Sequence, residues 1–263
     1  MPHGTVMTRV IFTEVNIIKY LYLFLAAVFI IMLPGCMPAE TPEHSVTEEF
    51  EETEEVNDLS PEIPVREPVE IEGLVLVNDL DESIIIDLKY ATADNFTGQV
   101  IYPVEVAAIK KETGERLVKA QEIFKQDGYR IKLWDAYRPL SAQHVLWEAY
   151  PDPRYVIKPQ DPPPSSDFRP RHNNGMAVDI TLVDRNGNEL EMPTSFDDFS
   201  EKAAPDYSDL PDVVRQNRDY LIEVMERVGF RVVSTEWWHF DDVTGTPGPY
   251  LDVPLEAFLN NTD

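Results

Sequence analysis

Apolar and polar residues follow regular patterns mainly in the last two thirds of the chain, from about residue 71 to residue 263. Runs of β-branched residues there predict strands, and apolar residues spaced three and four positions apart predict helices. The predicted strands are 73–77, 83–90, 129–135, 177–182 and 230–235, and the predicted helices are about 115–127, 141–150 and 212–228. This mixture, without an internal repeat, favours a single α+β domain in which helices pack on a mostly antiparallel sheet.

Turn and loop signals separate these elements. We expect residues 78–82 to form the turn between the first two strands, and residues 184–187 to form a hairpin turn around an Asn-Gly pair. The proline-rich stretch 151–170 predicts an irregular loop that walls the functional site. In the strand that begins at Ala177, side chains alternate between two faces, so Asp179 should point out of the core from a half-buried strand.

Residues 1–36 have the features of a lipoprotein-type signal peptide. The continuously apolar run 20–33 follows Lys19 and is shorter than the roughly 20 residues that a membrane span needs. It leads into Leu33-Pro34-Gly35-Cys36, which resembles a bacterial lipoprotein box and contains the only cysteine of the chain. We therefore expect lipidation of Cys36, with an uncleaved anchor helix as the alternative. Both readings place the remainder outside the cytoplasmic membrane, anchored to a bacterial cell membrane.

The charge of the chain divides it into a linker and a domain. Residues 37–70 hold twelve acidic residues and one arginine with few large apolar groups, so they predict a disordered acidic linker. From residue 71 onward, 19 Lys and Arg stand against 35 Asp and Glu, a net charge of 19 − 35 = −16. This balance argues against nucleic acid as a partner. Residues 71–263 suffice for one catalytic domain without disulfides, and nothing indicates an obligate protein partner.

The residues that could carry chemistry lie in two segments about sixty positions apart. Catalytic zinc typically takes three ligands from His, Asp and Glu and leaves a fourth position open. His172, Asp179 and His239 therefore predict a site for one zinc ion. Glu236, three residues before a ligand, would lie beside the metal and act as a base toward water at the open position.

The spacing of these residues constrains the backbone. His172 and Asp179 are seven residues apart, so they must lie at the end of a loop and the start of a strand, and Gly175 permits the bend. Glu236 and His239 are three residues apart, which in a flat strand would put them on opposite faces. A bulge or a tight turn must therefore lie between them.

Hydrolysis of an amide also needs a positive group where the oxyanion forms. The best candidate is Arg138, which a following proline fixes at the end of a predicted strand. A local ion pair between Arg138 and Asp135 explains the same pattern equally well, and the composition leaves both interpretations open.

Four segments, in the same order as in the family, resemble the zinc D-alanyl-D-alanine dipeptidases of the VanX type, which form subfamily D of peptidase family M15. The segments lie between about Ile84 and the C-terminus and are Asp87–Gly98, Tyr137–Pro139, His172–Asp179 and Glu236–His239. The resemblance implies an enzyme that uses one zinc ion to hydrolyse a small D-amino-acid dipeptide.

The same resemblance implies a role for each matching residue. His172, Asp179 and His239 would bind the zinc ion. Glu236 would be the base and Arg138 the group that stabilises the transition state. Tyr90 and Asp197 would contact the free amino end of the substrate, where an aspartate can pair with an ammonium.

Two positions depart from the family pattern. Pro170 stands where the family usually has a serine, two residues before the first histidine, and Met176 replaces a small residue. The VanX enzyme is cytoplasmic, whereas this chain has the features of an exported protein. A role in antibiotic resistance therefore does not follow, and D-Ala-D-Ala from cell-wall turnover is the expected substrate.

Three functions compete at this point. The first is hydrolysis of D-Ala-D-Ala to free D-alanine, and the second is a D,D-carboxypeptidase that trims terminal D-Ala from peptidoglycan stem peptides. The third is a non-catalytic wall-binding lipoprotein that contains zinc. Asp197 favours the first because an anion there demands an ammonium. Glu236 and Arg138 argue against the third because a structural zinc site needs neither.

Overall fold

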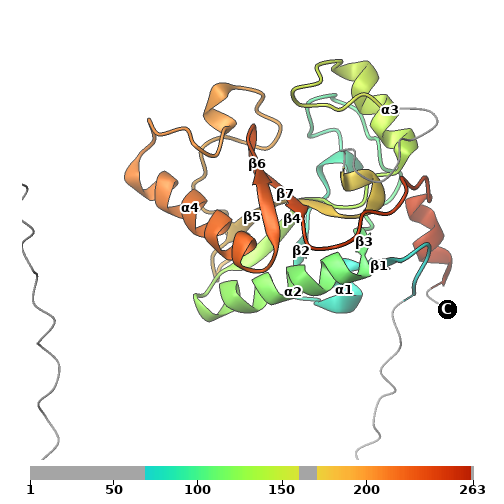
Figure 1. Ribbon diagram of the computed structural model, residues 1–263, viewed down its shortest axis with the longest axis horizontal. Helices are drawn as coiled ribbons and strands as arrows, with labels where there is room; N and C mark the ends of the chain where they lie inside the picture. The colour runs from blue at the N-terminus through green and yellow to red at the C-terminus, as the bar shows by residue number, and fades with distance from the viewer. Residues whose placement is uncertain (1–68, 160–170, 262–263) are drawn as a thin grey trace, which may run out of the picture. The chain divides into compact units, whose positions relative to one another are not determined.

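A five-stranded mixed sheet forms the centre of the fold (Figure 1). The computed structural model describes residues 69–159 and 171–261. The strand order is β2-β4-β5-β7-β6, and the strands are β2 (Ile85–Ile86), β4 (Arg130–Asp135), β5 (Ala177–Val183), β7 (Glu236–Asp242) and β6 (Phe230–Val233). β2 pairs with β4 in parallel, and the other pairings are antiparallel. The α+β class is confirmed, but the sheet is mixed.

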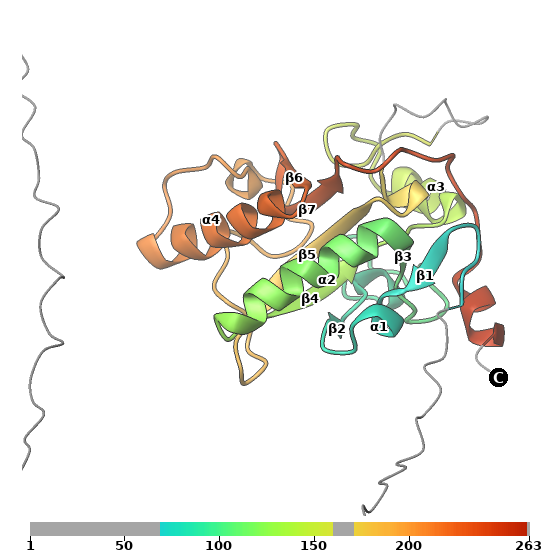
Figure 2. The same ribbon diagram turned by 60° about the horizontal axis from the view of Figure 1, so that its bottom comes forward.

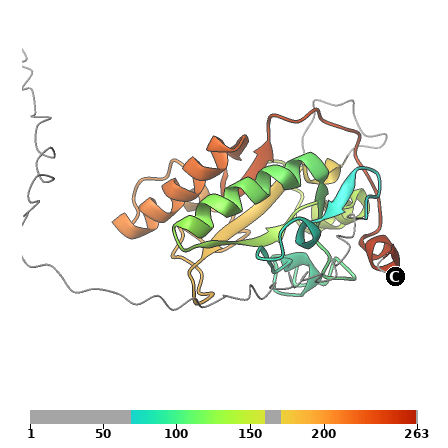
Figure 3. The ribbon, with the colours of Figure 1, turned by 90° about the horizontal axis from the view of Figure 1, so that it is seen from below.

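Two long helices cover one face of this sheet, α2 (Lys111–Gln126) and α4 (Asp212–Arg227) (Figures 2 and 3). Each helix buries a stripe of apolar residues at helical spacing against the sheet. The buried apolar residues are Leu117, Ala120 and Phe124 on α2, and Leu221, Val224 and Met225 on α4. The shorter helix α3 (Leu140–Ala149) follows β4 near the functional site. The helices predicted at 141–150 and 212–228 are confirmed to within a residue, and α2 begins four residues before its predicted start.

The hairpin predicted from residues 73–90 is wrong. β1 (Leu74–Leu76) leads directly into a short helix, α1 (Val77–Leu80), and pairs instead with β3 (Ala108–Lys110) in a separate two-stranded sheet. β2 joins the central sheet and is only two residues long. The apolar, β-branched character of the segment predicts burial correctly, but local sequence does not determine which distant strand it pairs with.

β5 is buried along its whole length, so the prediction of a half-buried strand is wrong. Val178, Ile180 and Leu182 contribute to the apolar core, as the alternation predicts. The opposite face carries Asp179 and Thr181, which line two adjoining cavities beneath the loop segments around the site. Asp179 therefore points out of the apolar core but not into open solvent.

The remaining short elements are 3₁₀ turns, and their bounds are η1 (Lys89–Ala91), η2 (Arg171–Asn174), η3 (Glu201–Ala203) and η4 (Leu255–Asn261). The predicted signal peptide with Cys36, and the predicted linker up to residue 68, lie outside the described residues. Within the described ranges, no helix combines the length and the apolar character that crossing a membrane requires.

Candidate metal centre and active site

Three segments bring the predicted zinc ligands together. His172 lies in η2, Asp179 in β5 and His239 in β7. Gly175 makes the bend from η2 into β5 with φ of +71°. A Cβ atom at this position would lie 2.8 Å from the backbone nitrogen of Lys110, so glycine is required both by its conformation and by the space.

The bulge predicted between Glu236 and His239 is present. In the pairing of β6 with β7, Val232 lies opposite Phe240 but Val233 lies opposite Glu236, so β7 has additional residues at this point. Both Glu236 and His239 consequently line the same cavity. Glu236 Oε2 lies 3.8 Å from His239 Nδ1, which places the carboxylate beside the donor atom of the ring and not on it.

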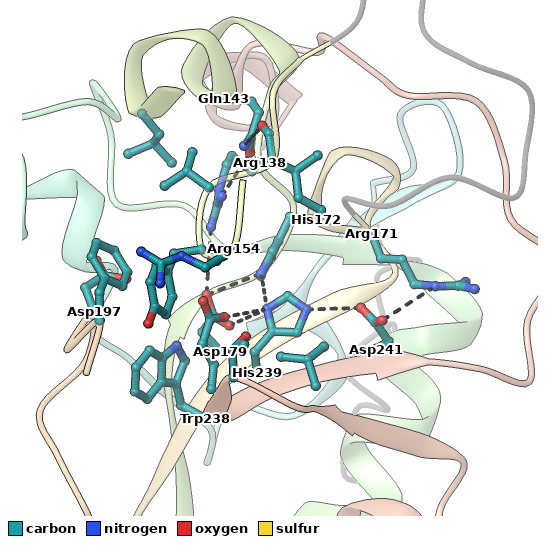
Figure 4. A pocket seen from close by; sticks show the side chains of 18 of the residues that line it. Arg138, Gln143, Arg154, Arg171, His172, Asp179, Asp197, Trp238, His239 and Asp241 are labelled. Atoms are coloured by element: carbon teal, nitrogen blue, oxygen red, sulfur yellow. Dashed lines mark hydrogen bonds and ion pairs between the residues drawn. The ribbon is translucent and has the colours of Figure 1, made fainter. Parts of the chain in front are cut away.

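The donor atoms of the three predicted ligands converge on one point (Figure 4). His172 Nε2 lies 3.1 Å from His239 Nδ1 and 3.3 Å from Asp179 Oδ2. Asp179 Oδ1 lies 3.0 Å from His239 Nδ1. One ligand atom from each residue falls within 4.8 Å of the others, a spacing that allows all three to contact one ion.

Hydrogen bonds on the far side of each ring fix which nitrogen faces this point. His172 Nδ1–H donates to the carbonyl oxygen of Ala136 at 2.6 Å, and His239 Nε2–H donates to Asp241 Oδ1 at 3.0 Å. In the neutral rings the two inward nitrogens then present lone pairs to each other, which repel unless a cation or a proton lies between them. Asp179 Oδ1 is buried without a hydrogen bond among the described residues. This donor set fits a zinc ion.

Burial and neighbouring charges act on the two acidic groups in opposite directions. Burial alone would raise the pKa of Asp179, but the charges of His172 and His239 outweigh it and hold that pKa well below its usual range. For Glu236, burial dominates and raises the pKa to about 7, despite the charge of His239. A divalent cation at the centre would lower the pKa of Glu236 from this value, since positive charge favours the carboxylate.

The ion pair predicted between Arg138 and Asp135 is present. Its Nη2 and Nε donate to Asp135 Oδ2 at 2.6 and 2.9 Å, and its Nη1 donates to Gln143 Oε1 at 2.9 Å. The same guanidinium lines the cavity, with Nη2 3.8 Å from Asp179 Oδ2. The ion pair with Asp135 therefore fixes a positive group at the edge of the metal centre.

Tyr90 and Asp197 meet on another wall of the cavity, although 107 positions separate them. The hydroxyl of Tyr90 donates to Asp197 Oδ2 at 3.0 Å, and the Arg138 guanidinium lies 5.2 Å from the centre of the Tyr90 ring. Burial, together with the charges of Asp179 and Glu236, raises the pKa of Asp197 well above its usual value. Asp197 also has φ of +56°, a conformation that residues other than glycine adopt infrequently. An entering cation would stabilise its charged form.

The seven predicted site residues of the domain line one cavity of about 480 Å³: Tyr90, Arg138, His172, Asp179, Asp197, Glu236 and His239. The stretch predicted to wall the site does so in its described part, through residues 153–157. Gln143 and Asp241 also line the cavity and were not predicted from the sequence. Nothing in the sequence marks Gln143. Asp241, however, lies two residues after His239 in a strand and therefore on the same face, a signal that the alternation rule could have used.

Comparison with known proteins gives a consistent result. Residues 70–256 match the family described as peptidase M15, D-Ala-D-Ala dipeptidase. The D-alanyl-D-alanine dipeptidase of Escherichia coli strain K12 is 37% identical over 175 residues, which cover 66% of this chain and 87% of that protein. The D-alanyl-D-alanine dipeptidase of Enterococcus faecium is 31% identical over 201 residues, which cover 70% of this chain and 98% of that protein. Among solved structures, the LdcB LD-carboxypeptidase aligns with a TM-score of 0.35 at 16% identity, over 74% of this chain and 80% of that chain, a likeness too weak to carry an inference.

Proposed function

The chain belongs to the peptidase M15 family of D-Ala-D-Ala dipeptidases and is a hydrolase, and from this premise we propose that it cleaves D-Ala-D-Ala to free D-alanine with one zinc ion. One observation carries the proposal: the partly buried carboxylate of Asp197 accepts a hydrogen bond from Tyr90 in the cavity that contains the converging ligands. A dipeptide with a free amino group offers the ammonium that this carboxylate lacks.

The proposed ligands are His172, Asp179 and His239, whose donor atoms already point at a common centre. Zinc bound there supplies Lewis acidity, which polarises the scissile carbonyl and makes water more acidic. These residues hold the ligand atoms in a fixed arrangement that is largely shielded from solvent. His172 and Asp179 are each at most 3% exposed.

Glu236 is the proposed general base. Its carboxylate lies beside His239 without occupying the ligand position, so it can accept a proton from the attacking water and return it to the leaving amine. Burial raises the pKa of Glu236 in the metal-free site, and a bound cation would lower it, so with zinc present the carboxylate would be ionised and able to accept the proton.

Arg138 is the proposed partner of the oxyanion. Asp135 and Gln143 hold its guanidinium in one orientation, so little rearrangement is needed when negative charge develops on the carbonyl oxygen. Tyr90 and Asp197 would orient the substrate by its ammonium, with charge-assisted hydrogen bonds that an N-acylated peptide cannot make.

The direct test measures release of free D-alanine by the purified full-length protein. We expect hydrolysis of D-Ala-D-Ala, and weak hydrolysis of N-acetyl-D-Ala-D-Ala and of a muramyl pentapeptide. The Glu236→Ala variant serves as the blank for contaminating peptidases. Equal or faster release from the pentapeptide would overturn the dipeptidase proposal in favour of a D,D-carboxypeptidase. Zinc binding without release from any of the three would favour the non-catalytic lipoprotein.

We also propose that the protein acts outside the cytoplasmic membrane, anchored through a lipid on Cys36. The apolar run 20–33 and the sequence that follows it support this location, and the substrate would then come from cell-wall turnover. Labelling of cells with a radioactive fatty acid tests the anchor. The label should appear on the protein and disappear in Cys36→Ser, and an unlabelled wild-type protein would contradict lipidation.

A further inference from the structure

A second buried carboxylate lies directly behind the metal centre. Asp241 is 1% exposed, and its Oδ1 accepts a hydrogen bond of 3.0 Å from His239 Nε2, the ring nitrogen that faces away from the other ligands. His239 therefore lies between two carboxylates, Asp179 on the metal side and Asp241 on the outer side.

Asp241 also faces the segment that carries the first ligand. Arg171 immediately precedes His172, and its Nε lies 3.9 Å from Asp241 Oδ2. Its Nη1 donates to the backbone carbonyl of Asp242 at 3.1 Å. Figure 4 shows the resulting series of contacts from His239 through Asp241 to Arg171. Two ligand segments that are 67 residues apart in sequence are thus joined outside the centre as well as at it.

We propose that Asp241 is a positioning residue that sets the zinc affinity of the site through His239 and, by its contact with Arg171, aligns η2 with β7. This inference rests on the proposed zinc site but not on the identity of the substrate. Asp241 does not need to touch the metal or the substrate to have this effect.

The two histidines differ in the group that orients each ring, and only the group behind His239, Asp241, can be removed by substitution. His172 is oriented by a backbone carbonyl, that of Ala136, which no substitution removes. His239 is oriented by a side chain. A carboxylate behind a ligating histidine fixes the ring and increases the basicity of its inner nitrogen, and loss of such a partner typically weakens metal binding 10- to 100-fold.

Positive charge near Asp241 explains how a second carboxylate can be buried so close to the first. Arg171 contacts it directly, and Arg231 lies opposite it in the pairing of β6 with β7 and lines the same cavity. Paired residues on neighbouring antiparallel strands share a face, so Arg231 extends on the side of Asp241. A buried charge needs such compensation, because an unpaired carboxylate would be protonated or would destabilise the fold.

The experiment compares zinc dissociation constants of the full-length protein, measured by competition with a chromophoric chelator and without any substrate. We expect Asp241→Asn to weaken zinc binding roughly 10- to 100-fold, and Asp241→Ala at least as much. Asp242→Asn is the matched control. Asp242 is the next residue and fully buried, but its carboxylate is held by Thr113, Arg116 and Thr244 and does not contact His239.

Asp242→Asn should lower the thermal midpoint and leave the zinc dissociation constant within about twofold of the wild type. Equal weakening in Asp241→Asn and Asp242→Asn would overturn the proposal, because it would indicate general loss of structure. Zinc binding by Asp241→Asn within twofold of the wild type would also overturn it.

Two further measurements separate positioning from stability. In the zinc-free protein, nitrogen-15 NMR of the imidazoles should show His239 with its proton on Nε2 in the wild type and a mixture of tautomers in Asp241→Ala. Arg171→Gln should weaken zinc binding by itself but add little to Asp241→Asn in the double variant. Fully additive losses would contradict the coupling. Failure of the dipeptidase assay would leave these zinc measurements unaffected, so the two proposals fail separately.

Discussion

Both faces of β5 are buried, but one carries apolar side chains and the other carries polar side chains. On the face toward α2 and α4, Val178, Ile180 and Leu182 pack in the apolar core. On the other face, Asp179 lies among imidazoles and carboxylates that burial makes costly to charge. The comparison teaches that one strand can provide stability and chemistry together, because alternation keeps the two sets of side chains apart.

Removal of zinc should have the largest effect, and only on the polar face. We expect a chelator to reduce release of D-alanine to background and zinc to restore it, since the Lewis acid is lost while the apolar face remains packed. Far-ultraviolet circular dichroism should change little in parallel. Full activity in the chelated, metal-free protein would exclude the proposed chemistry.

Glu236→Gln should lower kcat by about 10²- to 10⁴-fold, the usual contribution of a general base. The free energy of unfolding should not fall, because glutamine has the same shape and removes the burial of a charge. Steady-state kinetics and chemical denaturation measure the two quantities, with bound zinc determined by atomic absorption. A large loss of stability with a normal kcat would assign Glu236 to structure instead.

Leu182→Ala tests the apolar face. Leu182 is fully buried, so its truncation should reduce the free energy of unfolding by about 2–5 kcal/mol. The specific activity of the folded fraction should stay near that of the wild type, because the side chain points away from the site. Urea titration gives the first value, and an activity assay well below the midpoint gives the second. A selective loss of activity would show that the faces are not independent.

Asp197→Asn should lower kcat/KM for the dipeptide roughly 10- to 100-fold, because a hydrogen bond to a charged group contributes about 1.5–3 kcal/mol. Hydrolysis of the muramyl pentapeptide, which has no ammonium at this position, should change much less. The ratio of the two values is the measurement. Equal losses for both substrates would argue against recognition of the amino end by Asp197.

Thr181→Val should have the smallest effect, and it should stabilise the protein, whereas most substitutions of buried residues destabilise it. The hydroxyl of Thr181 is buried on the polar face and makes no hydrogen bond with the described residues. Replacing it with a methyl group of similar size should raise the free energy of unfolding by about 1 kcal/mol. Thermal denaturation measures the change. A clear destabilisation would indicate that the hydroxyl has a partner, such as an ordered water molecule.

Local patterns predicted the three longer helices well, and the three residues chosen from the sequence as zinc ligands converge in the structure. The stripe Leu221, Val224 and Met225 defines α4 because helical spacing is a property of neighbouring residues. The bulge in β7 could be inferred because Glu236 and His239 have to reach one site. These predictions needed only the spacing of neighbouring residues, or the requirement that a base and a metal ligand reach the same site.

The features that were missed depend on distant contacts. The partner of β1 is β3, and the segment before β2 becomes a helix, neither of which short-range pattern can determine. The full burial of β5 depends on loops that pass over its polar face. Asp197 could be singled out only through the family resemblance, since its meeting with Tyr90 spans 107 positions.

Because of the bulge in β7, Glu236 and His239 face the same cavity only when two residues separate them. Insertion or deletion of one residue between them would turn one of the two side chains to the opposite side of the strand, with no intermediate arrangement. Length changes at this point would therefore separate the capacity to hold a metal from the capacity to move a proton. A chain shortened in this way would keep either the metal ligand His239 or the base Glu236 in the cavity, but not both.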